Sequence, residues 1–244
     1  MSPTPPAPNW SAPIWSASGV LQHGMLAVDI VGFGRHDPAL HTYLRDALYR
    51  IVTNSLAQIG VPLQSCHRED RGDAVLVITP ASVSVEPLLG HWIHQLRAAL
   101  RHYNQISAAT AQLRLRVGIH AGFVKADHYG VAGRAILHLC RLLDAPAFKT
   151  ALETSQSDVG LITSDYLYQE VVRDGPGLID PATFTPISVN AKETRGRAWI
   201  YLPPPPAGIP QPPATPSTIC APSQTRTARG PRSHGLHRGP GHRH

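Results

Sequence analysis

The pattern of apolar and polar residues divides the chain into alternating strand-like and helix-like segments between about residues 24 and 202. Residues 24–31 are apolar on both faces, which is typical of a central strand covered by helices. Asp37 and Pro38 then provide an N-cap and a first helical position, and leucine and isoleucine recur at helical spacing down to Gly60, a typical terminator. The first two predicted elements are therefore a buried strand and a long helix that packs on the sheet.

The pattern after Gly60 predicts a hairpin, two further helices and several short strands. The charged segment 69–72 separates two short apolar runs, which indicates a β-hairpin with Asp73 at the start of its second strand. Residues 113–119 alternate between apolar and polar side chains and thus predict a strand with one buried face. The hairpin strands are predicted at 61–68 and 74–78, the helices at 85–103 and 133–143, and the last strands around 160–163, 185–189 and 198–202.

The order of the first six elements matches the ferredoxin-like βαββαβ arrangement. The predicted fold class is α+β, with an antiparallel sheet and helices on one face. In this topology the first strand lies beside the hairpin, so Asp29 at the end of that strand should lie close to Asp73. Two converging carboxylates favour a hard cation, which completes an octahedral shell with water and phosphate oxygens. The pattern outlines a metal-dependent nucleotide site.

The composition of both ends differs from that of the middle. Residues 1–22 hold five prolines and no charged side chain, and residues 203–244 hold eleven prolines, five arginines and no acid. Such segments bury too little apolar surface to offset their ordering entropy, so we expect a disordered lead-in, a domain over 23–202 and a disordered tail. Without the tail arginines, the net charge of +6 falls to about +1.

The role of the tail is left open by its residues. It could contact an anionic surface or offer its proline run to a groove-binding module, or it could serve only to keep the chain soluble. No aromatic residue stands among the tail arginines, which argues against nucleic-acid binding because bases have nothing to stack on.

The cysteines and the hydropathy pattern bear on the compartment. Cys66, Cys140 and Cys220 show no metal-ligand spacing, and an odd number without a secretory signal argues against a disulfide framework. We expect reduced thiols in a cytoplasmic protein. No run of eighteen apolar residues occurs, so no membrane-spanning helix is expected.

Three blocks of sequence resemble the class III adenylate and guanylate cyclases. Val28-Asp-Ile-Val-Gly-Phe33-Gly is similar to the first metal-binding strand of that family, and Arg71-Gly-Asp73-Ala-Val-Leu is similar to the segment with its second metal aspartate. Arg116-Val-Gly-Ile-His120-Ala-Gly122, followed by Gly133 to Leu142, resembles the strand and helix that form the dimer arm. The resemblance covers nearly all of the predicted domain and implies the nucleotidyl cyclase type of α+β fold.

The resemblance implies roles for individual residues. Two Mg²⁺ or Mn²⁺ ions would bridge the triphosphate and the side chains of Asp29 and Asp73, with the carbonyl of Ile30 as a further ligand. Arg141, from the partner subunit, would stabilise phosphoryl charge in the transition state. The loop formed by Val31, Gly32, Phe33 and Gly34 could cradle phosphates with its backbone N–H groups, although a plain strand-to-helix turn would have the same sequence.

Four positions depart from the family pattern or match it loosely. Leu137 stands where the family has an asparagine that orients the ribose, and leucine donates no hydrogen bond. Glu69 occupies a base-reading position as the guanine-type residue, but it also fits a charged hairpin. The second base-reading position is Gly130, which has no side chain. Lys192 and Arg195 are candidates for a late lysine that contacts the triphosphate.

These features predict a domain that binds a metal complex of GTP or ATP, with weak or lost conversion to a cyclic nucleotide. The site would lie between two subunits, in a homodimer or in a heterodimer with a related cyclase chain. The alternatives are a catalytically silent dimer that senses nucleotide and a scaffold that acts through protein partners.

Overall fold

The computed structural model describes residues 20–127, 130–192 and 194–204, which belong to one structural unit. Most of the predicted lead-in and nearly all of the predicted tail lie outside the described residues. Cys66 and Cys140 are free thiols, and burial raises the pKa of each, whereas Cys220 is outside these ranges. None of the helices in the described ranges combines the length and the apolar character that a membrane span requires.

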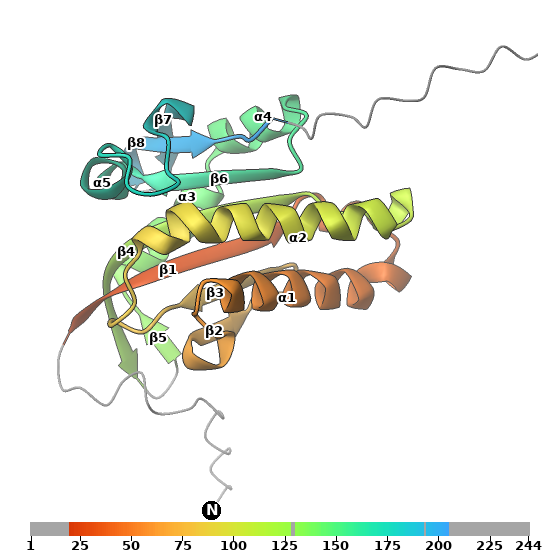
Figure 1. Cartoon of the computed structure of the whole chain (residues 1–244), viewed down its shortest axis with the longest axis horizontal. Coiled ribbons are helices and arrows are strands. Elements are labelled where there is room, and N and C mark those ends of the chain that lie inside the picture. Colours follow the sequence, from red (N-terminus) through yellow and green to blue (C-terminus); the bar gives the residue numbers. More distant parts are fainter. Residues whose placement is uncertain (1–19, 128–129, 193, 205–244) are drawn as a thin grey trace, which may run out of the picture. The chain divides into compact units, whose positions relative to one another are not determined.

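An eight-stranded sheet forms the centre of the domain, in the order β2-β3-β1-β4-β6-β8-β7, with β5 paired to β4 (Figure 1). All pairs are antiparallel except β4 and β6, which run parallel. The strands are β1 (Leu21–Ile30), β2 (His67–Asp70), β3 (Ala74–Ile78), β4 (Leu115–Asp127), β5 (Gly130–Ala132), β6 (Val159–Ser164), β7 (Phe184–Ala191) and β8 (Thr194–Tyr201).

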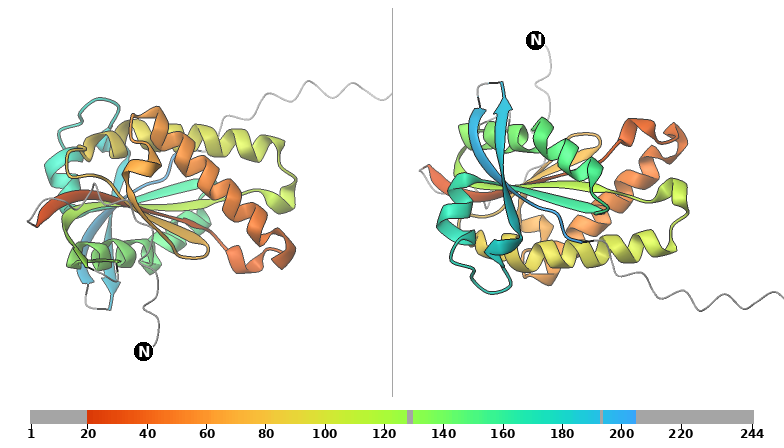
Figure 2. Two further views of the ribbon diagram at one scale, coloured as in Figure 1. Left: turned by 90° about the horizontal axis from the view of Figure 1, so that it is seen from below. Right: turned by 90° about the horizontal axis from the view of Figure 1, so that it is seen from above.

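Helices cover both faces of this sheet. Figure 2 shows α1 and α2 on one face and α3 and α4 on the other. The side chains that point inward form two apolar clusters, one on each face, because residues alternate in direction along each strand. The helices are α1 (His41–Gln58), α2 (Ile93–Ile106), α3 (Arg134–Leu143), α4 (Pro146–Thr154) and the short α5 (Asp165–Leu167).

Local signals in the sequence explain how the long helices begin and end. The Asp37 side chain accepts a hydrogen bond from the Ala39 amide at 2.9 Å and caps a 3-10 turn that leads into α1. Gly60, with φ +73°, turns the chain just after α1. A side chain at Gly118 would lie 2.8 Å from Leu139, so glycine at this point of β4 allows α3 to pack closely.

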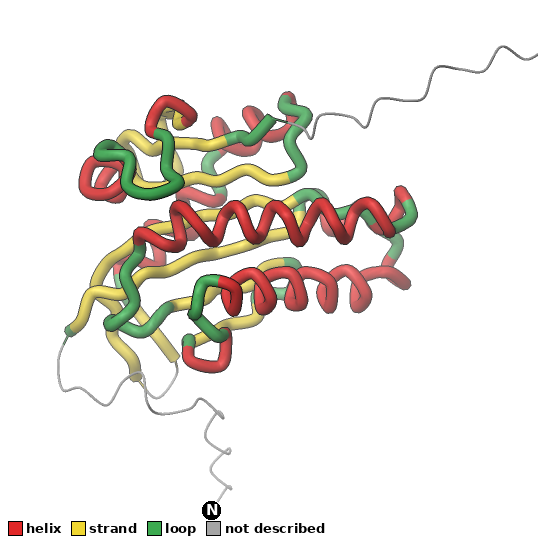
Figure 3. Tube along the Cα trace, in the orientation of Figure 1, coloured by secondary structure: helices red, strands yellow, loops and turns green. Residues whose placement is uncertain are grey.

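The predicted α+β class and ferredoxin-like core are confirmed. The elements β1, α1, β2, β3, α2 and β4 follow the expected order, and both core helices lie on the same face (Figure 3). The domain adds to this core in two ways. β6 runs parallel to β4, so the complete sheet is mixed, and α3 and α4 cover the face that the core helices leave open.

Candidate functional site

Asp29 lies at the end of the central strand β1, with a partner on each side. In register it faces Ala74 of β3 and Arg116 of β4. Only 8% of Asp29 is exposed. Arg116 donates from Nε to Asp29 Oδ1 at 2.8 Å and from Nη2 to Oδ2 at 2.5 Å, which makes a two-pronged ion pair. The fold thus buries a carboxylate at the strand end and holds it with a guanidinium.

Asp73 lies beside this pair. The Ile30 amide donates to the Asp73 carbonyl oxygen at 3.0 Å, which fixes the turn before β3 against the end of β1. Burial raises the pKa of Asp29, the hydrogen bonds and charge of Arg116 oppose this rise, and the negative charge of Asp73 adds to it. The two carboxylates therefore repel each other, and a cation between them would relieve that repulsion.

The donor set suits a hard divalent cation. A carboxylate has about four lone-pair positions, so a guanidinium that binds both oxygens of Asp29 leaves others available. No hydrogen bond or ion pair joins the Asp73 carboxylate to another described residue. Across these residues no group of three or more His, Cys, Asp or Glu side chains could hold an ion, so most ligands would be water, backbone or phosphate oxygens. Mg²⁺ commonly has such a shell.

The loop after β1 is shaped by a glycine and covered by an arginine. Gly32 adopts φ +70°, a left-handed conformation that favours glycine, and precedes a 3-10 turn over Phe33–Arg35. A side chain on Gly32 would collide with the guanidinium of Arg35, whose Nε would lie 2.7 Å from its Cβ. The Phe33 ring stacks on His41 with centroids 4.2 Å apart. The loop from Val31 to Gly34 is thus compact, with a cationic side chain folded over it.

Glu69 has protein partners within its own hairpin. Arg71 donates to its carboxylate at 3.1 and 2.5 Å, and the ring of His67 lies within hydrogen-bond distance at 3.2 Å. Glu69 is also near Gly130, since a Cβ on that glycine would lie 3.7 Å from Oε1 of Glu69. The structure therefore brings the two expected base-reading positions together, with the carboxylate already engaged.

Leu137 and Arg141 lie one turn apart on α3 and line the same cavity of about 1010 Å³. Leu137 is 55% exposed although it is apolar. Two histidines also line this cavity. The ring centroids of His120 and His138 are 4.8 Å apart, and burial lowers the pKa of both imidazoles, to about 4 for His120.

Arg116, Arg35 and His120 are the residues that the sequence did not single out. Arg116 is a polar residue of the alternating segment 113–119, and such a pattern predicts that its side chain faces solvent. The register of β4 against β1 instead places Arg116 opposite Asp29. The sequence did contain a signal that could have identified Arg116. A buried carboxylate requires a charged or hydrogen-bonding partner, and an arginine on a neighbouring strand is able to form that ion pair. Lys192, which has φ 53°, lies in the turn between β7 and β8, and Arg195 is the second residue of β8, opposite Asn190 of β7.

The mixed sheet and its ferredoxin-like core are the fold of the class III adenylate and guanylate cyclase domains. The chain is similar to a solved adenylate/guanylate cyclase/hydrolase from Silicibacter pomeroyi, with 20% identity and a TM-score of 0.54 over 76% of this chain and 99% of that one. It is also similar to a bacterial light-regulated adenylyl cyclase, with 12% identity and a TM-score of 0.50 over 74% of this chain and 90% of that one. No family model and no curated protein matches the sequence.

Proposed function

We propose that this domain binds a complex of a divalent cation and a nucleoside triphosphate, and that it converts the nucleotide to a cyclic product weakly or not at all. The observation that supports this most directly is the pair of carboxylates, Asp29 and Asp73, at the meeting ends of β1 and β3. Mg²⁺ or Mn²⁺ would be held by these side chains, with the Ile30 carbonyl as a further ligand, and would supply positive charge against the triphosphate.

Arg116 supports the proposal because its guanidinium can serve two anions in turn. It holds both carboxylate oxygens of Asp29. When a bound divalent cation neutralises the charge of Asp29, the guanidinium of Arg116 is attracted to that carboxylate less strongly. Phosphate oxygens offer the same paired acceptor geometry as a carboxylate. Arg35 adds a second cation over the loop from Val31 to Gly34, next to the backbone N–H groups that we propose as phosphate donors.

The weak turnover follows from Leu137. Arg141 is available on α3 as the residue that would stabilise the transferred phosphoryl group, but Leu137 offers no hydrogen bond with which to orient a ribose hydroxyl. A misplacement of the reacting groups by about 1 Å is enough to reduce a rate about 10²-fold. Because Glu69 is engaged by Arg71 and His67, we propose that both GTP and ATP are bound.

The site would be completed by a second subunit, either another copy of this chain or a related cyclase chain. In a two-fold dimer, Arg141 of each subunit would face the carboxylate pair of the other and form two equivalent sites. The exposed side chain of Leu137 is consistent with an interface on α3, because a large apolar side chain gains stability when it is covered.

Nucleotide binding is tested by thermal unfolding with Mg²⁺ and GTP or ATP. A ligand at about one hundred times its Kd stabilises the native state by about 2.7 kcal/mol, so the midpoint should rise only when both are present. Asp73→Asn should abolish this rise, since it removes a negative charge from the cation site. Asp46→Asn, at an exposed position of α1, is the matched control and should keep it. No rise in the unsubstituted protein, or an equal rise in Asp73→Asn, would contradict the proposal.

Turnover is tested with Mn²⁺ and each nucleotide, with Asp29→Ala as the blank. We expect little or no cyclic product. A typical enzymatic turnover of about 10 s⁻¹ that disappears in the blank would show that cyclisation is intact.

A catalytically silent dimeric module that senses nucleotide, or acts as a scaffold through protein partners, is the second candidate. It is favoured by the exposed apolar residues Phe123 and Leu137, which are 62% and 55% exposed. Analytical sedimentation with and without Mg²⁺ and GTP distinguishes a nucleotide sensor from a scaffold. A sensor should change its association state with nucleotide, whereas a scaffold should associate to the same extent without it.

A further inference from the structure

Helices α1 and α2 lie side by side over one face of the sheet, and the proposed function does not use their outer sides (Figure 1). A groove of about 270 Å³ separates them, with Arg50 of α1 and His102 and Ile106 of α2 in its lining. We call the outer sides of the two helices the α1–α2 surface, which includes Tyr43, Arg50, Arg97, Arg101, His102 and Ile106.

The positive charge of this surface is not balanced by ion pairs. The chain contains no acidic residue between Glu86 and Asp127, a stretch that includes all of α2. Among the residues that the structure describes, no ion pair involves Arg50, Arg97 or Arg101. These guanidinium groups therefore keep their full charge for an anionic partner.

The residues outside the described ranges do not supply the missing acid. Glu193 is the one acidic residue among them. The next residue, Thr194, lines the cavity beside α3, and α3 covers the opposite face of the sheet from α2. The balance of charge on the α1–α2 surface is thus set by described residues.

The basic tail of the chain begins at this surface. Arg97 of α2 donates from Nη2 to the carbonyl oxygen of Pro204, the last described residue. A carbonyl oxygen does not neutralise a guanidinium. The sequence after Pro204 has five arginines and no acid, so a second set of positive charges is tethered to the α1–α2 surface. Two tethered sets of like charge reinforce each other on an extended anionic partner.

Large apolar side chains are exposed among these cations. Ile106, the last residue of α2, is 74% exposed, and Tyr43 near the start of α1 is 46% exposed. The ring of Tyr43 lies 6.4 Å from that of Tyr103, which lines the same groove as Ile106. Exposed apolar side chains beside basic ones are typical of a surface that lies in a membrane interface. A nucleic acid would gain little from Ile106.

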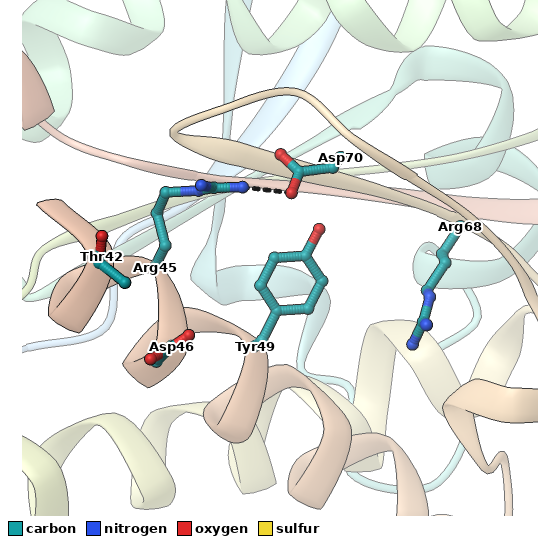
Figure 4. Close-up of a pocket in the computed structure, with 6 residues that line it drawn as sticks. All are labelled: Thr42, Arg45, Asp46, Tyr49, Arg68 and Asp70. Atoms are coloured by element: carbon teal, nitrogen blue, oxygen red, sulfur yellow. Dashed lines mark hydrogen bonds and ion pairs between the residues drawn. The ribbon is translucent and has the colours of Figure 1, made fainter.

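The other flank of α1 differs in charge. Figure 4 shows a pocket of about 460 Å³ there, in which the guanidinium of Arg45 is paired with Asp70. Arg68 and Asp46, the one acid of α1, also line it, so two arginines are balanced by two aspartates. The excess of positive charge is thus a property of the α1–α2 surface and not of every helix flank.

We propose that the α1–α2 surface docks on a bilayer that contains anionic phospholipids. Ile106 and Tyr43 would enter the headgroup region, while Arg50 and Arg101 would contact lipid phosphates. The surface lies on the opposite face of the sheet from α3, so a second subunit on α3 would leave it accessible. The proposal does not rest on the nucleotide function, because it needs neither carboxylate of the candidate site.

The test is co-sedimentation of the full chain with vesicles in about 0.1 M salt, where screening acts over about 10 Å. Vesicles of phosphatidylcholine and phosphatidylglycerol should bind the chain, and vesicles of phosphatidylcholine alone should bind it much less. Arg101→Gln should weaken the binding about fivefold, the usual contribution of one basic residue near an anionic membrane. Ile106→Ser should weaken it about tenfold, because it removes an apolar side chain from the interface.

Both variants should fold normally. Arg101 forms no hydrogen bond or ion pair with another described residue, and Ile106 is mostly exposed. Arg68→Gln is the matched control, since it removes the same charge from the pocket of Figure 4, and it should bind the vesicles as the unsubstituted chain does.

Three results would overturn the proposal. The first is an absence of binding to the anionic vesicles, or equal binding to the neutral ones. The second is equal binding by Arg101→Gln, Ile106→Ser and Arg68→Gln, which would show that the tail alone or the overall charge holds the chain on the vesicles. The third is tighter binding to a DNA duplex than to the vesicles, with no loss in Ile106→Ser, which would indicate a nucleic-acid surface. Asp73→Asn should bind vesicles normally, which separates this result from any failure of nucleotide binding.

Discussion

Acid should destabilise this domain through one buried histidine, His120. Only 8% of His120 is exposed, and burial, followed by the positive charge of a protonated His138, lowers its pKa from 6.5 to about 4. One pKa unit corresponds to about 1.4 kcal/mol, so protonating His120 in the native chain is unfavourable by about 3 kcal/mol relative to the unfolded chain.

The sign of the effect follows from where the proton binds. Between pH 6.5 and about 4 the unfolded chain carries the proton on this histidine and the native chain does not. The free energy of unfolding therefore falls as the pH falls through this range, with a slope of up to about 1.4 kcal/mol per pH unit, and the loss is complete below about pH 4. Above pH 6.5 His120 contributes no pH dependence.

The measurement is urea unfolding at several values of pH between 4 and 7.5, for the unsubstituted protein and for His120→Gln. Glutamine does not titrate and can still hydrogen-bond to Ser164, whose Oγ lies 2.8 Å from the histidine ring. The pH dependence of the free energy of unfolding should therefore differ between the two proteins by the uptake of one proton on unfolding. His94→Gln removes an exposed histidine from α2 and is the control. Parallel profiles for the unsubstituted protein and His120→Gln would refute the reasoning.

Two further substitutions test the ion pair at Asp29 and the ribose-orienting position at Leu137. Arg116→Gln should lower the free energy of unfolding by about 3–5 kcal/mol, because it leaves the buried Asp29 carboxylate without its guanidinium, and adding Asp29→Asn should recover part of that loss in urea unfolding. An equal loss in the double variant would show that the ion pair is not the cause. Leu137→Asn should raise cyclic-product formation from GTP or ATP with Mn²⁺ at least tenfold if ribose orientation is what limits turnover. Unchanged turnover, with binding retained, would place the limit elsewhere.

Much of the fold could be predicted from local patterns. The buried run of β1, the Asp37 cap and Gly60 after α1 each act within a few residues of their own position, so they can be recognised in the sequence. The convergence of the end of β1 with the hairpin could also be predicted, because it follows from the order of the elements. β4 proved longer than predicted, because it pairs with the whole of β1 as far as Leu21, and that pairing is a property of two strands together.

The second layer of helices was harder to predict. The pattern of α3 indicates an apolar face, but not which face of the sheet that helix covers. α4 was not predicted at all, since only Phe148 and Leu152 are fully buried in its nine residues. Both helices pack against side chains such as Met25 and Ile162, which point away from α1 and α2. Their placement depends on tertiary packing more than on any local signal.

The candidate site shows the same division between local and non-local information. Asp29 could be recognised by its position at a strand end, whereas its partner Arg116 is 87 residues away and is identified only by register. The pairing changes the electrostatics of the site, because a carboxylate that already holds a guanidinium contributes less net charge to a cation than a free one. Asp73, which has no such partner among the described residues, would then contribute more to cation affinity. This inequality is why Asp73→Asn, and not a substitution of Asp29, is the sharper probe of metal binding, since Asp29 also stabilises the fold through Arg116.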